Sequence, residues 1–403
     1  MLPDRRPDLA LIAPYPPAGE RHGGPSGVAS YTANLAHGLA AAGLDVDVVA
    51  PELDGDPPEF TDGPISVRRS FPMGRRALPR ALRAAAERAA RVVHLQFELF
   101  LYGGPPSLVG LVPALGAAHR ALGDTPLVTT MHQVVEPSSV DRHYTRVHRV
   151  AAPAVVARSG IAGVQSAISR VGAATIVHEE PFKRILPAAT VIPHGIEEVA
   201  PMARGLARRH VDLDDRFVVL SFGFLAPYKG IELVLEAARR LRPDVQVVVA
   251  GGEHPRMAGG RSFGAELRER YGDVARFTGW VPDGDVGAWF GAADLCVFPY
   301  PRPFASSGVL ALALAHGAPV LLSPALARCA GVPSVLTSPM TAGALARRIE
   351  QLADDPDALA QLRDWSGPLA AGRRWSSVSE QHARLYEEVL DVDRHARRRV
   401  RSR

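Results

Sequence analysis

The sequence is short of cysteine and of long apolar runs. Cys296 and Cys329 are its two cysteines, too few for a disulfide framework, and no cysteine and histidine cluster has the spacing of a zinc site. No stretch approaches the about 18 uninterrupted apolar residues of a membrane span, and the run Leu9–Ala13 is too short for a signal peptide. These absences favour a cytoplasmic globular protein.

Lysine is also scarce, because arginine supplies almost all of the positive charge. Lys183 and Lys229 are the only lysines in 403 residues. A lysine in such a chain indicates a site that needs a compact cation on a flexible stem, which arginine does not replace. The net charge of +4 is small, and basic residues are not interleaved with aromatic ones, which excludes a typical nucleic-acid partner. Membrane association through an arginine-bearing, alanine-rich helix at 78–90 stays an alternative to an ordinary surface helix.

Short apolar runs alternate with alanine- and leucine-rich helical patterns along the whole chain. Strictly alternating strands and helices predict an α/β fold with parallel sheets covered on both faces. The rhythm restarts after Pro201, which predicts two doubly wound, Rossmann-like domains facing a ligand cleft. We expect an N-terminal acceptor-binding domain at 1–199, a C-terminal donor-binding domain at 200–375, a crossover helix at 376–390 and a basic, disordered tail at 391–403.

Two features of the first half are candidates for ligand contacts. Gly23 and Gly24 precede a helix that begins near Gly27, so their backbone can approach a ligand beside the helix amides. A flexible surface loop would also need glycine. His132 follows the strand at Leu127–Thr130 and is expected at the carboxyl end of the sheet, where a hydrogen-bonded turn histidine is the alternative.

Two further features lie in the second half. Lys229 follows a strand at Phe217–Phe222 and the residue Gly223, in a position to neutralise a diphosphate. A solvated lysine is the alternative, although a cation is unfavourable near a helix start. Ser306, Ser307 and Gly308 open a helix that includes Val309, which gives an anion site or ordinary capping.

In order, these pieces resemble the GT-B glycosyltransferases of the retaining family 4. The resemblance covers some 300 residues and is carried by Gly23-Gly24, Thr130-Met131-His132, Val191-Ile192-Pro193-His194-Gly195, Gly223…Lys229-Gly230, Val249-Ala250-Gly251-Gly252, Phe277-Thr278-Gly279…Pro282, Ala293-Asp294-Leu295…Pro299 and Gly317-Ala318-Pro319-Val320. It implies two Rossmann-like domains and a last helix, Ser377–Leu390, that returns to the first domain.

The resemblance also implies roles for single residues. His132 would bind the donor sugar, Lys229 would bind the diphosphate, and the amides of Gly23, Gly24 and the helix start at Ser306–Gly308 would contact phosphate and sugar. The family usually has an arginine at the position that follows Gly223. It also usually has two glutamates, at the positions that Phe304 and Leu312 occupy here. This sequence has Phe224 in place of the arginine and lacks both carboxylates, as a Ser-Ser-Gly version of the loop does, and Arg302 is a candidate for the missing cationic contact.

The implied reaction is transfer of a hexosyl group from a UDP- or GDP-sugar to an acceptor hydroxyl with retention of configuration. No metal and no cofactor are expected, because Lys229 and helix amides can neutralise the leaving diphosphate. The bacterial composition suggests natural-product or envelope-glycan biosynthesis. The acceptor pocket is expected between the loops Glu52–Gly63, Phe97–Pro106 and Val134–Tyr144, with Phe97, Tyr102 and Gln133 as candidate contacts, although core packing explains the aromatic residues equally well.

Two alternatives stay open from the residues alone. The lost glutamates are compatible with a GT-B pseudoenzyme that acts as a partner subunit or non-catalytic binding protein. A nucleotide-sugar epimerase would need carboxylate acid and base groups, which the sequence does not place.

Overall fold

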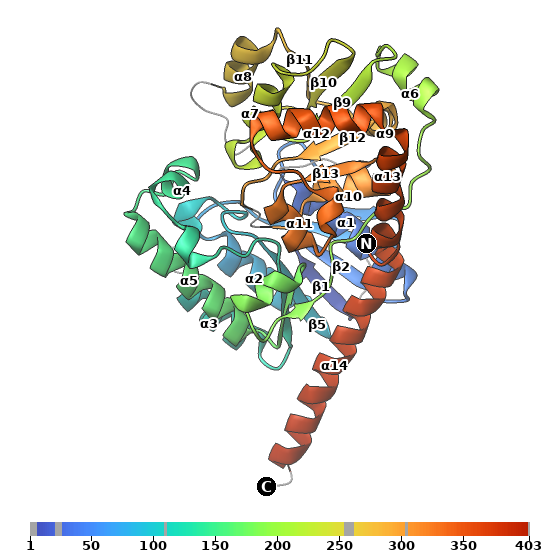
Figure 1. Ribbon diagram of the computed structural model, residues 1–403. Coiled ribbons are helices and arrows are strands. Elements are labelled where there is room, and N and C mark those ends of the chain that lie inside the picture. The colour runs from blue at the N-terminus through green and yellow to red at the C-terminus, as the bar shows by residue number, and fades with distance from the viewer. Residues whose placement is uncertain (1–5, 21–25, 109–110, 254–261, 303–304, 402–403) are drawn as a thin grey trace. The chain divides into compact units, whose positions relative to one another are not determined.

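The computed structural model describes residues 6–20, 26–108, 111–253, 262–302 and 305–401. The chain forms two compact units. Unit 1 comprises Met1–Gly195 and Trp375–Arg403, and unit 2 comprises Ile196–Arg374. The sequence placed the divisions after residues 199 and 375. Figure 1 shows helices and strands in alternation along both parts of the chain.

Unit 1 is built on an eight-stranded sheet with the order β3-β4-β2-β1-β5-β6-β7-β8. Its strands pair in parallel except β3, which runs antiparallel to β4 at one edge. Strands β1, β2, β5 and β6 are buried along their whole length, which is why they read as nearly continuous apolar runs. The strands are β1 (Leu9–Ile12), β2 (Val46–Pro51), β3 (Glu59–Asp62), β4 (Ile65–Phe71), β5 (Val92–Phe97), β6 (Leu127–Met131), β7 (Ala174–Val177) and β8 (Thr190–Val191).

Helices of unit 1 connect these strands and cover the sheet. The long helix α5, for example, buries Ile161, Val164 and Ile168 at helical spacing. The helices are α1 (Gly27–Ala41), α2 (Ala77–Glu87), α3 (Leu111–Leu122), α4 (Arg142–Val147), α5 (Ala154–Val171) and α14 (Trp375–Arg401), with short 3₁₀ helices η1 (Pro105–Leu108), η2 (Pro137–Ser139) and η3 (Glu180–Arg184).

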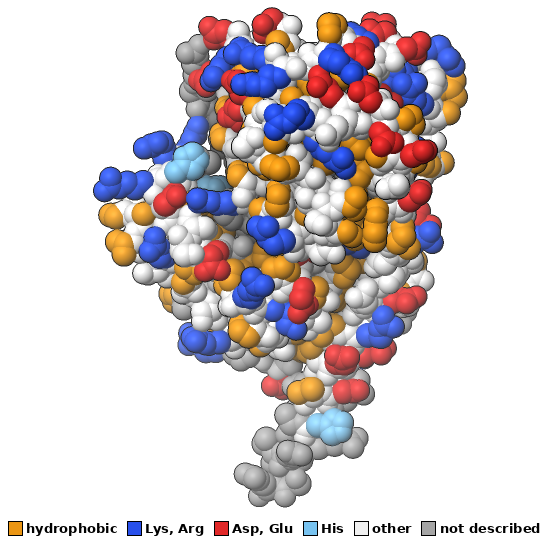
Figure 2. Space-filling view, in the orientation of Figure 1, with side chains coloured by type: hydrophobic (Ala, Val, Ile, Leu, Met, Phe, Trp, Pro, Cys, Tyr) orange, Lys and Arg blue, Asp and Glu red, His pale blue; other side chains and the backbone are white. Residues whose placement is uncertain are grey.

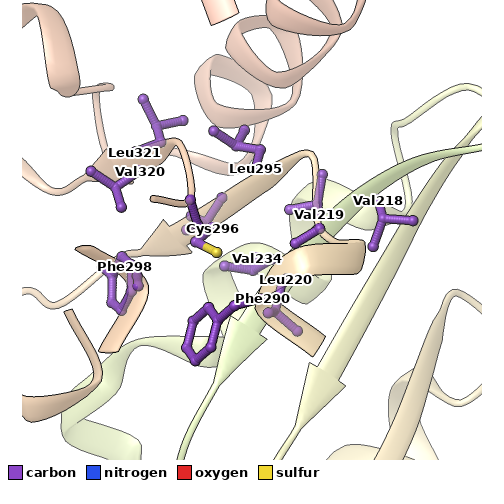
Figure 3. Packing of buried hydrophobic residues seen from close by; sticks show 14 of the residues in the cluster. Val218, Val219, Leu220, Val234, Phe290, Leu295, Cys296, Phe298, Val320 and Leu321 are labelled. Carbon is purple, nitrogen blue, oxygen red and sulfur yellow. The ribbon is translucent and has the colours of Figure 1, made fainter. Parts of the chain in front are cut away.

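Unit 2 has a five-stranded parallel sheet with the order β11-β10-β9-β12-β13. Figure 3 shows its core, in which β9, β12 and β13 pack their side chains against Val234 of α7 and Phe290 of α9. The strands are β9 (Phe217–Phe222), β10 (Val245–Ala250), β11 (Ala275–Gly279), β12 (Leu295–Phe298) and β13 (Val320–Leu322). The helices are α6 (Arg204–His210), α7 (Ile231–Ala238), α8 (Phe263–Tyr271), α9 (Asp283–Ala292), α10 (Gly308–Ala315), α11 (Pro324–Ala330), α12 (Ala342–Asp354) and α13 (Pro356–Ala371), with 3₁₀ helices η4 (Pro227–Lys229) and η6 (Ser334–Leu336).

Helix α14 belongs to unit 1 and packs against α1. Val378, Leu385 and Tyr386 of α14 are buried in the core of unit 1, as expected for a helix that returns to the first domain. The helix does not stop at residue 390 but continues to Arg401, where the sequence predicted a disordered tail (Figure 1). An already formed helix extends at low cost through alanine and arginine, which are good helix formers.

One predicted loop contains a strand. The segment at 52–63 was expected to be irregular, but Glu59–Asp62 forms β3 and pairs with β4. Its side chains alternate between exposed and half-buried, as they do on an edge strand with one solvated face, so no apolar run marks it in the sequence.

The surface of the described residues is charged with both signs. Lysine and arginine side chains are interspersed with acidic ones over the face drawn in Figure 2. Among the residues that the structure describes, no helix is both long and apolar enough to cross a bilayer. Within the same residues no group of three metal-ligating side chains comes together.

Candidate functional site

The central strand of unit 2 leads directly to a buried lysine. β9 ends at Phe222, and the chain then turns through Gly223 into the 3₁₀ helix η4, which ends at Lys229. Gly230, with φ of 68°, reverses the chain into α7. A Cβ on Gly230 would stand 2.7 Å from the carbonyl oxygen of Pro299, so glycine is required for this close approach.

Lys229 is a cation in an apolar place. Its side chain is 7% exposed, and burial lowers its pKa from 10.5 to about 8. Over the parts of the chain that the structure describes, no carboxylate forms an ion pair with its ammonium group. A buried charge without a counter-ion is unfavourable, so the position suits a lysine that meets an anionic ligand.

The lysine ammonium and Val309, in the first turn of helix α10, both lie next to Gly223. A Cβ built on Gly223 would stand 2.9 Å from Lys229 Nζ and 2.7 Å from Val309 Cγ2. Gly223 has φ of 102°, which side-chain-bearing residues rarely adopt. Glycine therefore lets Lys229 and the first turn of α10 come together at the carboxyl end of β9.

The first turn of α10 presents backbone amides beside this lysine. The N-cap is Ser307, whose Oγ accepts a hydrogen bond from the amide of Leu310 at 3.1 Å. Ser306 precedes it, and Gly308 and Val309 are the first two residues of the helix. Free N–H groups at a helix start attract anions, and Gly223 borders both Val309 in this turn and the ammonium of Lys229.

Four positions near Lys229 and helix α10 bear on the departures from the family pattern. Leu312 is half-buried on α10 and is one of the partly buried residues packed against the unit 2 core, while Phe304 lies outside the described residues. Phe224, in the place of the usual arginine, packs beside Trp280 with ring centroids 5.7 Å apart. Arg302 is exposed on the loop before α10.

His132 follows β6 at the carboxyl edge of the unit 1 sheet, as the sequence predicted. It is 7% exposed, and the Tyr31 ring of α1 packs edge-on against it at 4.5 Å. Both of its ring nitrogens have protein partners: Nε2 lies 2.7 Å from Gln96 Oε1 and Nδ1 lies 3.2 Å from His178 Nε2. A ligand hydroxyl that bonds to Nε2 must therefore replace Gln96.

The pKa of His132 is held well below its ordinary value. The main cause is burial, and the nearby imidazoles of His178 and His194 add to it. His132 is therefore neutral near pH 7, with one nitrogen that donates and one that accepts. Gln96 and His178 were not predicted as site residues. His178 directly follows β7, as His132 follows β6, so the same signal was present there, whereas Gln96 lies one residue before the end of β5.

The candidate acceptor contacts have different outcomes. Phe97 and Tyr102 are each 1% exposed, and the Tyr102 hydroxyl donates to the carbonyl of Gln96 at 2.7 Å. Both residues are core residues in this structure, so the packing alternative accounts for them. Gln133 is also buried, but its Oε1 has no hydrogen-bond partner among the described atoms. Gly23 and Gly24 lie outside the described residues.

Two family models match the chain, one in each half. The model described as Glycosyltransferase Family 4 matches residues 25–200, and the model described as Glycosyl transferases group 1 matches residues 216–355. A D-inositol 3-phosphate glycosyltransferase of Thermobispora bispora is 31% identical over 206 residues, 47% of this chain and 48% of that protein. The matched segment thus spans about half the length of this relative.

Other matches extend over most of the length of both chains. The phosphatidyl-myo-inositol mannosyltransferase of Mycolicibacterium smegmatis is 25% identical over 390 residues, 91% of each chain. Anabaena HepE, solved in complex with UDP-glucose, superposes with a TM-score of 0.66 and 17% identity over 94% of this chain and 99% of that one. Two parallel-sheet units and two matching family models lead to one conclusion: this chain belongs to the family 4 glycosyltransferases and has the GT-B fold.

Proposed function

We propose that the protein transfers a hexosyl group from a nucleotide-diphosphate sugar to an acceptor hydroxyl, with retention of anomeric configuration. The main support for this proposal is Lys229. It is buried, has no ionic partner among the described residues and lies beside the first turn of α10. The UDP-glucose found in HepE supports a UDP-sugar, and the mannosyltransferase relative is compatible with a GDP-sugar as the alternative.

Unit 2 would bind the diphosphate of the donor. Lys229 would place its ammonium against the phosphate oxygens, while Gly223 keeps the approach open. The amides of Ser307, Gly308 and Val309 would bind phosphate or sugar oxygens, as would Ser306. Gly23 and Gly24 of unit 1, which lie outside the described residues, stay candidates for phosphate and sugar contacts. Arg302 would add a second cation from the exposed loop.

The reaction would depend on neutralising the negative charge of the leaving phosphate, and not on a protein side chain that acts as an acid or a base. As the bond between C1 and the phosphate oxygen breaks, negative charge grows on the phosphate, and Lys229 and the helix amides stabilise it. The acceptor oxygen bonds to C1 on the same face, and its proton goes to the leaving phosphate oxygen. No protein carboxylate is needed for this step, which agrees with leucine at position 312.

His132 would bind a hydroxyl of the donor sugar, and Gln133 would meet the acceptor through its unpartnered carbonyl oxygen. The choice of sugar and the binding of the ribose would differ from relatives that have both glutamates, because a leucine at 312 gives no hydrogen bond. The acceptor would be a small molecule or a glycan of natural-product or envelope biosynthesis.

A donor screen tests the proposal directly. The full chain is incubated with UDP- and GDP-sugars and an acceptor panel, and released nucleoside diphosphate is measured. Lys229→Met is expected to lose at least tenfold in kcat/KM. Lys183→Met is the matched control, because Lys183 is the other lysine and lies on the surface, 3.7 Å from Glu180.

Two outcomes would contradict the proposal. Equal rates in parent and Lys229→Met would remove Lys229 from the site. Binding of no nucleotide sugar by calorimetry would favour the alternative of a pseudoenzyme that serves as a partner subunit. Where product forms, the anomeric proton coupling in its NMR spectrum tests retention.

A further inference from the structure

A continuous row of hydrogen bonds crosses the core of unit 1 and ends at His132 and His178. It joins helix α14 to three neighbouring strands of the sheet, and its members are 0–7% exposed. The bonds are Tyr386 Oη to His94 Nδ1 at 2.7 Å, His94 Nε2 to Thr130 Oγ1 at 2.8 Å and to the Gln96 amide at 3.3 Å, Gln96 to His132 at 2.7 Å, His132 to His178 at 3.2 Å and His178 to the Ile192 carbonyl at 2.9 Å.

The Ile192 carbonyl determines which way the last bonds run. A carbonyl oxygen only accepts, so His178 donates from Nδ1. A neutral His178 then has a lone pair on Nε2, and it must accept from His132 Nδ1–H. A neutral His132 is left with a lone pair on Nε2, the nitrogen that faces Gln96.

Gln96 completes the row if its amide nitrogen faces His132. The amide can present either its oxygen or its nitrogen, because the two arrangements differ by a half-turn about the last side-chain bond. With the oxygen toward His132, either His132 or His178 would need a second proton, and burial disfavours the imidazolium. With the nitrogen toward His132, the Gln96 oxygen shares the His94 Nε2–H with Thr130 Oγ1, which lies closer at 2.8 Å, and His94 Nδ1 accepts from the hydroxyl of Tyr386.

We propose that this row fixes His132 as the neutral tautomer with its proton on Nδ1, so that Nε2 acts only as a hydrogen-bond acceptor. Tyr386 and Gln96 are then positioning residues, which act on the reaction through His132. The inference rests on the proposed role of His132 as a sugar contact. It adds a requirement for the substrate, whose group at His132 must donate a hydrogen bond: a hydroxyl or amino group, and not a carboxylate or phosphate oxygen.

The other groups around His132 are compatible with this tautomer. Tyr31 of α1 presents its ring and not its hydroxyl, and His194 meets Tyr31 and His178 through ring faces and edges. His382 of α14 lies against His94 and has its Nδ1 bonded to the Val378 carbonyl. None of these contacts places an acceptor atom on His132 Nε2 among the described residues.

The tautomer can be read by long-range ¹H–¹⁵N NMR of the full chain with labelled histidine. The His132 signals are assigned by their loss in His132→Asn. We expect a protonated Nδ1 and an unprotonated Nε2 at pH 7.5. Gln96→Glu places only oxygens beside Nε2 and is expected to move that nitrogen to the range of a protonated one. Tyr386→Phe removes the donor at the other end of the row, which helps to orient the Gln96 amide through His94. It is expected to shift the His132 Nε2 signal, while Nδ1 keeps its proton toward His178.

Tyr15→Phe is the matched control. It removes a buried tyrosine hydroxyl of the same unit, which donates to Asp62 at 2.7 Å outside the row, and it should leave His132 unchanged. A protonated Nε2 in the parent, or unchanged His132 signals in both Gln96→Glu and Tyr386→Phe, would overturn the proposal. The signals do not depend on turnover, so a protein that transferred no sugar would still test the row separately from the proposed function.

Discussion

The ammonium of Lys229 lies so close to Gly223 that a methyl group at position 223 would stand 2.9 Å from Nζ. The same methyl group would meet Val309 Cγ2 at 2.7 Å. Gly223→Ala must therefore move either the lysine or the first turn of α10. We expect at least a tenfold loss of donor affinity, measured by calorimetry with the nucleotide sugar that the screen identifies.

Gly331→Ala separates this effect from backbone strain. Gly331 lies in the same unit, has φ of 67° and has open space where a Cβ would be. Alanine there is expected to cost about 1 kcal/mol of stability, because positive φ is unfavourable for it. Donor affinity should stay as in the parent. Equal losses of affinity in both variants would mean that strain, and not the lysine, is responsible.

Lys229 should cost the protein stability. Burial lowers its pKa to about 8, so at pH 7 the folded protein holds a charge that the unfolded chain solvates better. Lys229→Met keeps the apolar stem and removes the charge. We expect unit 2 to become more stable by about 3 kcal/mol at pH 7, from the size of the shift.

The sign of the pH dependence follows from the same shift. Between about pH 8 and the ordinary lysine pKa, the unfolded chain binds more protons than the folded one, so the free energy of unfolding of the parent should rise with pH in this window. Lys229→Met should lack this rise. Denaturant unfolding at pH 7, 8.5 and 10 measures it, and parallel curves for parent and variant would contradict the buried charge.

Donor binding should depend on pH in the opposite sense. The diphosphate needs the ammonium form of Lys229, and above about pH 8 the lysine must take up a proton when the donor binds. We expect affinity to fall as the pH rises from 7 to 9.5. Calorimetry in two buffers of different ionisation enthalpy should detect proton uptake near pH 8.5. Binding without proton uptake there would show that Lys229 keeps its charge before the donor arrives.

Much of the fold could be predicted because its strands are short apolar runs between helical patterns. β9 and β10 are buried on both faces of a parallel sheet, and their sequences contain almost nothing else but apolar residues. β3 was not predicted, because an edge strand with one solvated face does not need a run of apolar residues. The last residues of α14 were also misjudged, since charge alone does not say whether a preceding helix continues through them.

The candidate site could be predicted where one short segment carries the signal. Lys229 and Ser307 follow strands in recognisable loops, and His132 follows one at the edge of the sheet. The row of hydrogen bonds from Tyr386 to His132 could not be predicted from the sequence. Tyr386 and His94 are 292 positions apart and meet only through the packing of α14. For Phe97 and Tyr102, only burial separates a core residue from a pocket residue.

Ser307 is expected to serve both the helix and the donor. Its Oγ accepts from the amide of Leu310, so Ser307→Ala should cost about 1 kcal/mol of stability. Thr341 caps α12 in the same way, through the amide of Ala344 at 3.3 Å, and is the matched control. Both variants should lose stability, while Ser307→Ala alone should raise the KM for the donor, by about three- to tenfold. An unchanged KM would assign Ser307 to capping only.

The packing of α14 on α1 can be tested through Gly38 and Ser379. A Cβ on Gly38 would clash with Ser379 Oγ, so Gly38→Ala should destabilise unit 1 by about 1–3 kcal/mol through overpacking. The hydroxyl of Ser379 is buried, and no hydrogen-bond partner is found for it among the described atoms. Ser379→Ala should therefore be neutral or slightly stabilising.

The double variant tells whether the two helices meet at this point in solution. If they do, alanine at 379 removes the nearest atom and relieves part of the cost of Gly38→Ala, so the effects are not additive. Hydrogen–deuterium exchange of peptides from α1 and α14 reports the stability of unit 1 without interference from unit 2. Strict additivity would mean that α14 leaves α1 in solution, and Tyr386 could then no longer reach His94.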